Sequence, residues 1–348
     1  MFENDVRSRT YNYLRLSLIA VVGGLFVALG VEWLESSGCF QTSVSAYYYT
    51  PVQAVFVGAL VALGVGMVAM YGRDAVEDAF LNLAGLFAPV VAFVPTVRAN
   101  RCGLVQATGG ELPNNVGPSQ VVDGAQVAID NNMWAFFAVV LVALVAMAVI
   151  RRKPVLSAVR PKGRGDNRDE RAPTGPSGFP YLLSYVIAAI AWVVGIVAFL
   201  WMRQAFYDRA HGVSAILLFL CVIVVVFSSA HLRVRKPYEQ RRAADPGIRE
   251  WKALPLVERL LATLKDRYGV LGLTMIVSVL AIAVYAALAT WDHWVLAIEA
   301  TLIALFGVFW VLQTIEHWAP PEEQPAPPRP EALEDRELGP PERTATPT

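Results

Sequence analysis

The chain has 348 residues, of which 55% are hydrophobic and 17% are charged, and its 29 basic and 29 acidic residues cancel. A net charge of zero gives no support for nucleic-acid binding, which relies on an excess of basic residues. The apolar residues are gathered in long runs that a water-soluble protein of this size would expose as very large patches, so a water-soluble fold is excluded too.

Eight of these runs are long enough to form transmembrane helices. A helix rises about 1.5 Å per residue, so roughly 20 apolar residues cross a hydrocarbon layer of about 30 Å. In chain order the predicted spans are 14–35, 51–71, 79–97, 132–150, 180–202, 212–230, 268–291 and 294–315. The sequence therefore predicts an all-α polytopic transmembrane helix bundle with eight spans, within residues 1–318.

The basic residues predict the orientation of the spans. If the spans alternate across a membrane, 25 of the 29 Lys and Arg residues lie on one side and 4 on the other. Cytoplasmic loops carry such an excess, so we expect both termini in the cytoplasm and the basic loops against an anionic inner leaflet. The basic start of the first span also resembles a secretory signal, but its apolar run continues past Gly30, which favours an uncleaved span.

Two segments outside the spans have patterns of their own. Apolar residues recur at helical spacing over about 253–266, which predicts an amphipathic cytoplasmic helix, either in the membrane interface or packed under the bundle. The stripe consists of Ala253, Leu256, Val257, Leu260, Leu261 and Leu264. Residues 319–348 are rich in proline and polar residues and are expected to form a disordered cytoplasmic tail.

The three cysteines fall into two groups. Cys39 and Cys102 lie in predicted outer segments and share an oxidising compartment, which makes them candidates for a disulfide. Cys221 lies in the middle of a span, where it is expected to be a small buried hydrophobic residue.

Glu299 is the sharpest candidate for a functional residue inside a span. Ionisable groups within spans are costly and usually face the interior of the bundle. On a helix Glu299 shares one face with Ile303, Phe306, Trp310, Gln313 and His317, so this stripe should face other helices. A purely structural role, with the carboxyl hydrogen-bonded to a neighbour, is the alternative.

Polar residues also gather near the first and third spans. Asp78 and Asn82 share a stripe with Gly85 and Pro89, which is typical of broken helices that line cavities and of kinked helices packed through small residues. Glu32 lies near the outer end of the first span.

A short segment between the first and second spans contains Ser45, Tyr47 and Tyr48. This tyrosine-rich segment predicts either an interfacial aromatic belt or the rim of an outward-facing pocket.

The stretch Ser43-Val44-Ser45-Ala46-Tyr47-Tyr48-Tyr49-Thr50 resembles a signature of a group of multi-pass membrane proteins, mainly actinobacterial, with no established activity. Val55-Phe56-Val57-Gly58, Glu77-Asp78, Asn82-Leu83-Ala84-Gly85 and Val94-Pro95-Thr96 look like further signatures of the same group. The resemblance covers about residues 40–97. It implies a bacterial plasma (inner) membrane protein and transfers no activity.

The leading hypothesis is a non-enzymatic protein that binds or passes a small molecule or lipid through an outward-facing polar pocket. The sequence contains no Walker A loop, dinucleotide fingerprint, nucleophile elbow or zinc-protease motif, and no cofactor is expected. An assembly component of the cell envelope is one alternative, and a membrane-embedded metal-dependent hydrolase using Asp78, His231 and His317 is another. The predicted ligand-binding residues are Glu32, Ser45, Tyr47, Tyr48, Asp78, Asn82 and Glu299.

Overall fold

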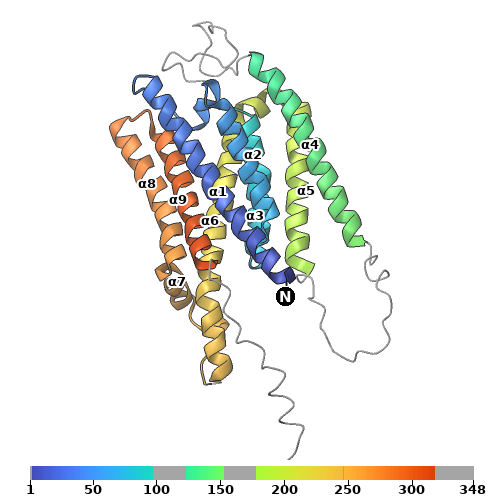
Figure 1. Cartoon of the computed structure of the whole chain (residues 1–348), viewed down its shortest axis with the longest axis vertical. Helices are drawn as coiled ribbons and strands as arrows, with labels where there is room; N and C mark the ends of the chain where they lie inside the picture. The colour runs from blue at the N-terminus through green and yellow to red at the C-terminus, as the bar shows by residue number, and fades with distance from the viewer. Residues whose placement is uncertain (1, 97–122, 153–177, 246, 318–348) are drawn as a thin grey trace, which may run out of the picture.

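The computed structural model describes residues 2–96, 123–152, 178–245 and 247–317, and these residues form helices and no strands (Figure 1). Two short 3₁₀ turns, η1 (Ser45–Tyr49) and η3 (Trp251–Ala253), lie between the longer helices. The helices are α1 (Phe2–Glu35), α2 (Gln53–Ala69), α3 (Ala75–Phe93), α4 (Asp123–Arg152), α5 (Gly178–Trp201), α6 (Arg203–Ala244), α7 (Leu256–Lys265), α8 (Arg267–Ala289) and α9 (Trp294–His317). The predicted all-α class is confirmed.

Six helices in the described part of the chain are long and apolar enough to cross a membrane: α1, α3, α4, α6, α8 and α9. Two shorter apolar helices, Gln53–Ala69 and Tyr185–Trp201, fall in the second and fifth predicted spans. These apolar helices are consistent with a multi-pass membrane protein. The number of eight spans and their orientation stay predictions.

Helices α3 and α6 form the centre of the bundle. Of the most apolar stretch of each helix, 56% is buried in α3 and 44% in α6, against 11% in α4. Helix α3 packs against α2, α5 and α6, while α1 packs against α2 and α9, and α8 packs against α6 and α9. In Figure 1 the turn η1 lies at one end of the bundle and α7 at the other, and we call these the η1 end and the α7 end.

Helix α3 begins at Ala75, four residues before the predicted span. The carboxylate of Asp74 accepts a hydrogen bond from the backbone N–H of Glu77 at 2.7 Å, which satisfies one of the free donors of the first turn. Hydropathy detects the apolar part of a helix and misses such a polar first turn. This earlier start puts Asp78 in the first turn of α3.

The crossing of α2 and α3 brings two backbones into contact. A Cβ atom added at Gly85 would lie 2.6 Å from the carbonyl oxygen of Gly64, closer than real Cβ contacts come. Small residues allow such an approach between membrane helices. The stripe that contains Gly85 therefore serves helix packing at this position.

Helix α6 is much longer than the predicted span 212–230. Its 42 residues correspond to about 63 Å, roughly twice the hydrocarbon thickness. The charged residues after the apolar run continue the helix because Arg, Lys, Glu and Gln favour helical backbone. One pair on this extension, Arg235 and Glu239, forms an i,i+4 ion pair with an N–O distance of 2.7 Å.

Helix α7 turns its apolar face outward. Leu256, Val257, Leu260 and Leu261 are between 49% and 70% exposed, while Thr263 is buried. This exposure excludes the alternative in which the apolar stripe packs under the bundle. An amphipathic helix with an uncovered apolar face is typical of a helix that lies in a membrane interface.

Candidate functional site

The segment before η1 is attached to the first turns of α9. The backbone N–H of Leu296 donates to the carbonyl oxygen of Thr42 at 3.0 Å, and His293 Nδ1 lies 3.2 Å from the carbonyl oxygen of Gln41. The first N–H groups of a helix have no partner within the helix. Here a carbonyl from a distant part of the sequence supplies one, and this fixes the η1 segment against α9.

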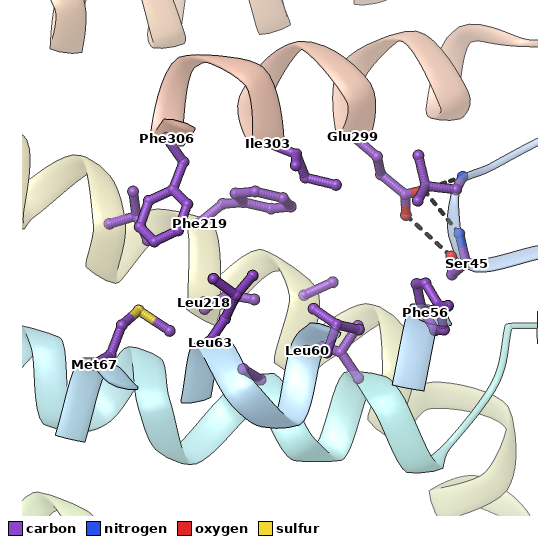
Figure 2. Close-up of a pocket in the computed structure, with 15 residues that line it drawn as sticks. Ser45, Phe56, Leu60, Leu63, Met67, Leu218, Phe219, Glu299, Ile303 and Phe306 are labelled. Atoms are coloured by element: carbon purple, nitrogen blue, oxygen red, sulfur yellow. Dashed lines mark hydrogen bonds between the residues drawn. The ribbon is translucent and has the colours of Figure 1, made fainter. Parts of the chain in front are cut away.

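Glu299, one turn further along α9, completes this attachment. Its Oε2 atom accepts from the backbone N–H of Val44 at 2.6 Å and from that of Ser45 at 3.3 Å. Its Oε1 atom lies 3.2 Å from Ser45 Oγ, and Figure 2 shows the carboxylate aimed at the start of η1. The prediction that Glu299 faces the interior of the bundle is confirmed.

The carboxylate of Glu299 acts as an N-terminal cap for η1. Val44, at the N-cap position, makes no capping bond with its own side chain, so the first N–H groups of η1 need an acceptor from elsewhere. A carboxylate suits this place because the start of a helix carries a partial positive charge. Glu299 therefore ties the η1 segment to α9.

A cavity of about 60 Å³ lies directly next to this attachment (Figure 2). It is lined by η1, α2, α3, α6 and α9, whose crossing leaves the space between them. The residues that line it are Val44, Ser45, Phe56, Leu60, Leu63, Met67, Ala88, Val91, Ala215, Leu218, Phe219, Val222, Glu299, Ile303 and Phe306.

The cavity is apolar except at one end. Ser45 and Glu299 supply its polar side chains, and Figure 2 shows them together, with Phe306 and Met67 at the opposite end. The stripe predicted on α9 provides one wall, because Ile303 and Phe306 follow Glu299 along the same face. Farther along this face Trp310 and Gln313 are buried, as the stripe predicts.

Tyr47 and Tyr48 are buried in η1 and do not line the cavity. Burial raises the pKa of Tyr47, the Glu32 carboxylate raises it further, and a hydrogen bond with the backbone of Gln41 opposes both effects. Burial also raises the pKa of Tyr48, against the effect of a hydrogen bond with the Gln53 side chain. Their burial excludes a lipid-facing aromatic belt.

Asp78 and Asn82 lie at the α7 end, away from Glu299. Asp78 Oδ1 accepts from the backbone N–H of Gly72 at 3.0 Å, and Asn82 Nδ2 donates to Asp78 Oδ2 at 3.2 Å. These bonds hold the turn between α2 and α3. The structure thus brings Ser45 next to Glu299 and Glu32 near Tyr47 at the η1 end, and Asp78 next to Asn82 at the α7 end.

The cysteines divide as the sequence suggests. Cys39 is disulfide-bonded, and Cys221 is a free, buried thiol. Cys102 lies outside the described residues, so the pairing of Cys39 with Cys102 stays a prediction.

No three His, Cys, Asp or Glu side chains gather as a metal site anywhere in the part of the chain that the structure describes. His211 Nδ1 lies 2.6 Å from the carbonyl oxygen of Val94, and the ring of His231 packs against Trp251 with centroids 5.7 Å apart. The side chain of His317 lies outside the described residues. The hydrolase alternative gains no support from Asp78, which bonds to Gly72 and Asn82, or from His231, which packs on Trp251.

A second polar cluster lies at the α7 end, and it was not predicted from the sequence. Glu316 Oε1 accepts from Arg233 Nη1 at 2.8 Å, while its Oε2 accepts from Arg267 Nη2 and from the Tyr268 hydroxyl, both at 2.5 Å. Arg233 Nε also pairs with Asp266 at 2.9 Å. The network joins α6, α8 and α9. Counting basic residues per side indicates orientation and says nothing about such pairs.

A comparison of the sequence with protein-family models gives no match, and searches of curated proteins and of solved structures give none. The resemblance to the actinobacterial group therefore stays a prediction.

Proposed function

We propose that the chain binds the hydrocarbon part of a membrane lipid in the cavity beside Glu299. The observation that carries this proposal is an apolar cavity inside a bundle of apolar helices, with its polar side chains at one end. An acyl or isoprenoid chain with a polar end has the same distribution of polarity. Its chain would contact the walls from α2 and α6, and its polar end would lie near Ser45 and Glu299.

The size of the cavity favours a slim ligand. Pockets for small molecules commonly measure roughly 300–1,000 Å³, whereas this cavity measures about 60 Å³. A single hydrocarbon chain needs less width than a ring system. The separate location of Asp78 and Asn82 supports binding rather than passage, since these residues add no polar path to the cavity.

The membrane setting is part of the proposal. We infer eight spans with both termini in the cytoplasm of a bacterial cell, in its plasma membrane. The distribution of basic residues supports this orientation, and it makes the η1 end the outer one. The cavity would then draw its ligand from the outer half of the bilayer.

Filling the cavity tests the proposal. Ala215→Phe places a ring in the α6 wall, while Ile216→Phe adds a ring at the next residue, which is 63% exposed. The protein is purified in mild detergent, and bound lipid is measured by native mass spectrometry. We expect one defined lipid on the wild-type protein and on Ile216→Phe, and at least about tenfold less on Ala215→Phe, which corresponds to about 1.4 kcal/mol.

Two results would contradict the proposal. The first is wild-type protein that carries no defined lipid, and the second is Ala215→Phe protein that retains as much lipid as Ile216→Phe. Thermal unfolding of both variants separates loss of binding from loss of the fold.

A further inference from the structure

Arg15 is a buried charge whose neighbours leave it unsatisfied. Its side chain lies on α1 near the α7 end, and the residue is 9% exposed. Its Nε atom has no hydrogen-bond partner, and no described residue forms an ion pair with its guanidinium. One turn along α1, Leu18 packs so closely on α2 that a Cβ added at Gly66 would lie 2.6 Å from its Cδ2 atom. Because Gly66 is in the last turn of α2, this contact places Arg15 near the turn between α2 and α3.

Arg73 in that turn is a second arginine with a free donor. Its Nε atom pairs with Glu77 at 3.1 Å, and its guanidinium lies 5.9 Å from the ring centroid of Tyr268. Its Nη2 atom is buried without a partner in the described part of the chain. The charges that act on Arg15 are those of Arg73 and Glu77, together with the phenols of Tyr268 and Tyr11. Glu77 pairs with Arg73 and only its charge acts on Arg15, so the Arg15 guanidinium has no paired carboxylate of its own.

The other carboxylates at the α7 end are already engaged. Glu316 accepts from Arg233, Arg267 and Tyr268, and Asp266 pairs with Arg233.

Two further carboxylates hold the α2–α3 turn. Asp74 accepts from the backbone N–H of Glu77, and Asp78 accepts from that of Gly72. None of these carboxylates is within ion-pair distance of Arg15.

An oxyanion with several acceptor atoms fits this arrangement. A buried charge without a partner is strongly unfavourable, and an anion between the two arginines would offset that cost. Guanidinium groups match phosphate oxygens with planar, paired donors. The cluster is reached from outside, because the side chains of Arg73 and Arg267 are 18% and 35% exposed.

We propose that Arg15 and Arg73 bind a phosphate group, and that this phosphate belongs to the headgroup of an anionic phospholipid. Helix α7 favours the lipid over free phosphate as the source. Its exposed apolar face suits the membrane interface, and two residues after its end the chain enters the cluster at Arg267 and Tyr268. A helix in the interface would hold these residues at the depth of headgroup phosphates.

Reconstitution in two lipids tests this site. Wild-type protein, Arg15→Gln and Arg73→Gln are placed in nanodiscs of phosphatidylcholine, with and without phosphatidylglycerol, and thermal unfolding is followed by intrinsic fluorescence. Arg235→Gln, at an exposed arginine of the same end, is the control for lost charge. We expect phosphatidylglycerol to raise the midpoint of the wild type and the control but not of the other variants. Native mass spectrometry should show at least tenfold less bound phosphatidylglycerol on Arg15→Gln.

The remaining outcomes separate the sources of phosphate from a structural role. If inorganic phosphate stabilises the wild type in phosphatidylcholine as phosphatidylglycerol does, and Arg15→Gln abolishes both effects, the phosphate site stands with a free anion as its ligand. If Arg15→Gln lowers stability equally in both lipids, Arg15 is a structural partner of Glu77 and the proposal is overturned. A control that loses the lipid effect overturns it too. Ala215→Phe leaves this lipid effect unchanged, so the site is tested separately from the cavity.

Discussion

Glu299 and Arg15 are ionisable residues on apolar helices, the first half-buried and the second buried, and their polar surroundings are opposite. Three donors from Val44 and Ser45 lie within 3.3 Å of the Glu299 carboxylate. No described residue bonds to the Arg15 guanidinium, and its charged neighbour Arg73 repels it. A charged residue within a span therefore has no single meaning. One serves the internal fold, and the other points to a partner from outside the chain.

The difference has a physical origin. A carboxylate needs N–H donors, and the start of η1 supplies two that lie outside any regular ladder. A guanidinium needs acceptors, and in helices almost all carbonyl oxygens are already used by the helix itself. A buried arginine must therefore find a carboxylate or an anion. Glu77 is the carboxylate at hand, and it pairs with Arg73.

The largest effect is expected for Glu299→Leu, which removes the acceptor and leaves the N–H groups of Val44 and Ser45 buried and unpaired. We expect a loss of about 4 kcal/mol in the free energy of unfolding, because each unsatisfied donor costs about 1–3 kcal/mol. Glu299→Gln keeps one acceptor oxygen and should lose less. Thermal unfolding in detergent measures both, with the exposed Glu35→Gln as control. Equal stability of Glu299→Leu and wild type would show that the Glu299 carboxylate does not stabilise the fold.

The next effect is expected at the crossing between the two ends. Gly85→Leu puts side-chain atoms where the Gly64 carbonyl oxygen lies, and overpacking of this kind costs about 3 kcal/mol. Gly58→Leu on α2, where a Cβ would meet no atom within 4 Å, is the matched control. The unfolding midpoints of the two variants should differ by several degrees. Similar midpoints would show that the backbones at the crossing separate easily.

Glu77→Gln tests the role of the carboxylate at the α7 end. It removes the carboxylate that pairs with Arg73 and whose charge also acts on Arg15, so we expect a loss of about 2 kcal/mol in neutral lipid from uncompensated positive charge. Phosphatidylglycerol should restore part of this stability, because Arg15 and Arg73 then both lack a paired carboxylate. The same nanodisc unfolding assay measures it. A loss of equal size in both lipids would argue against an anion at this end.

The smallest effect concerns the pH dependence of η1. Because burial raises the pKa of Tyr47 and Tyr48, their stabilising contribution is fully present below about pH 10 and is lost as pH rises through the higher pKa values of the folded state. Tyr47→Phe should reduce the alkaline loss of stability by less than about 1 kcal/mol. Unfolding midpoints from pH 8 to 11 test this, with the exposed Tyr13→Phe as control. An identical alkaline slope in Tyr47→Phe and wild type would be the contrary result.

Several features could be predicted from the sequence because they depend on local periodicity. The all-α class, the apolar helices, the amphipathic helix α7 and the inward face of α9 follow from the spacing of apolar residues. Ser45 and Glu299 were both predicted as ligand-binding residues. The hydrogen bond between them could not be predicted, since 254 residues separate them in the chain. The cavity walls from α2 and α6 carry no signal, because Leu60 or Leu218 looks like any other apolar residue of a span.

By itself the sequence determined which segments are apolar helices and which residues carry charge within or beside them. Apolar periodicity depends on neighbours along the chain, and an apolar helix face is stabilised by burial in lipid as well as in protein. The tertiary structure alone decided which charges are satisfied. It placed the donors of η1 against Glu299, and it brought Arg15 within the field of Arg73 and Glu77, which pair with each other. Hydrogen bonds and ion pairs act over a few ångströms, so they follow from how the helices cross and not from composition.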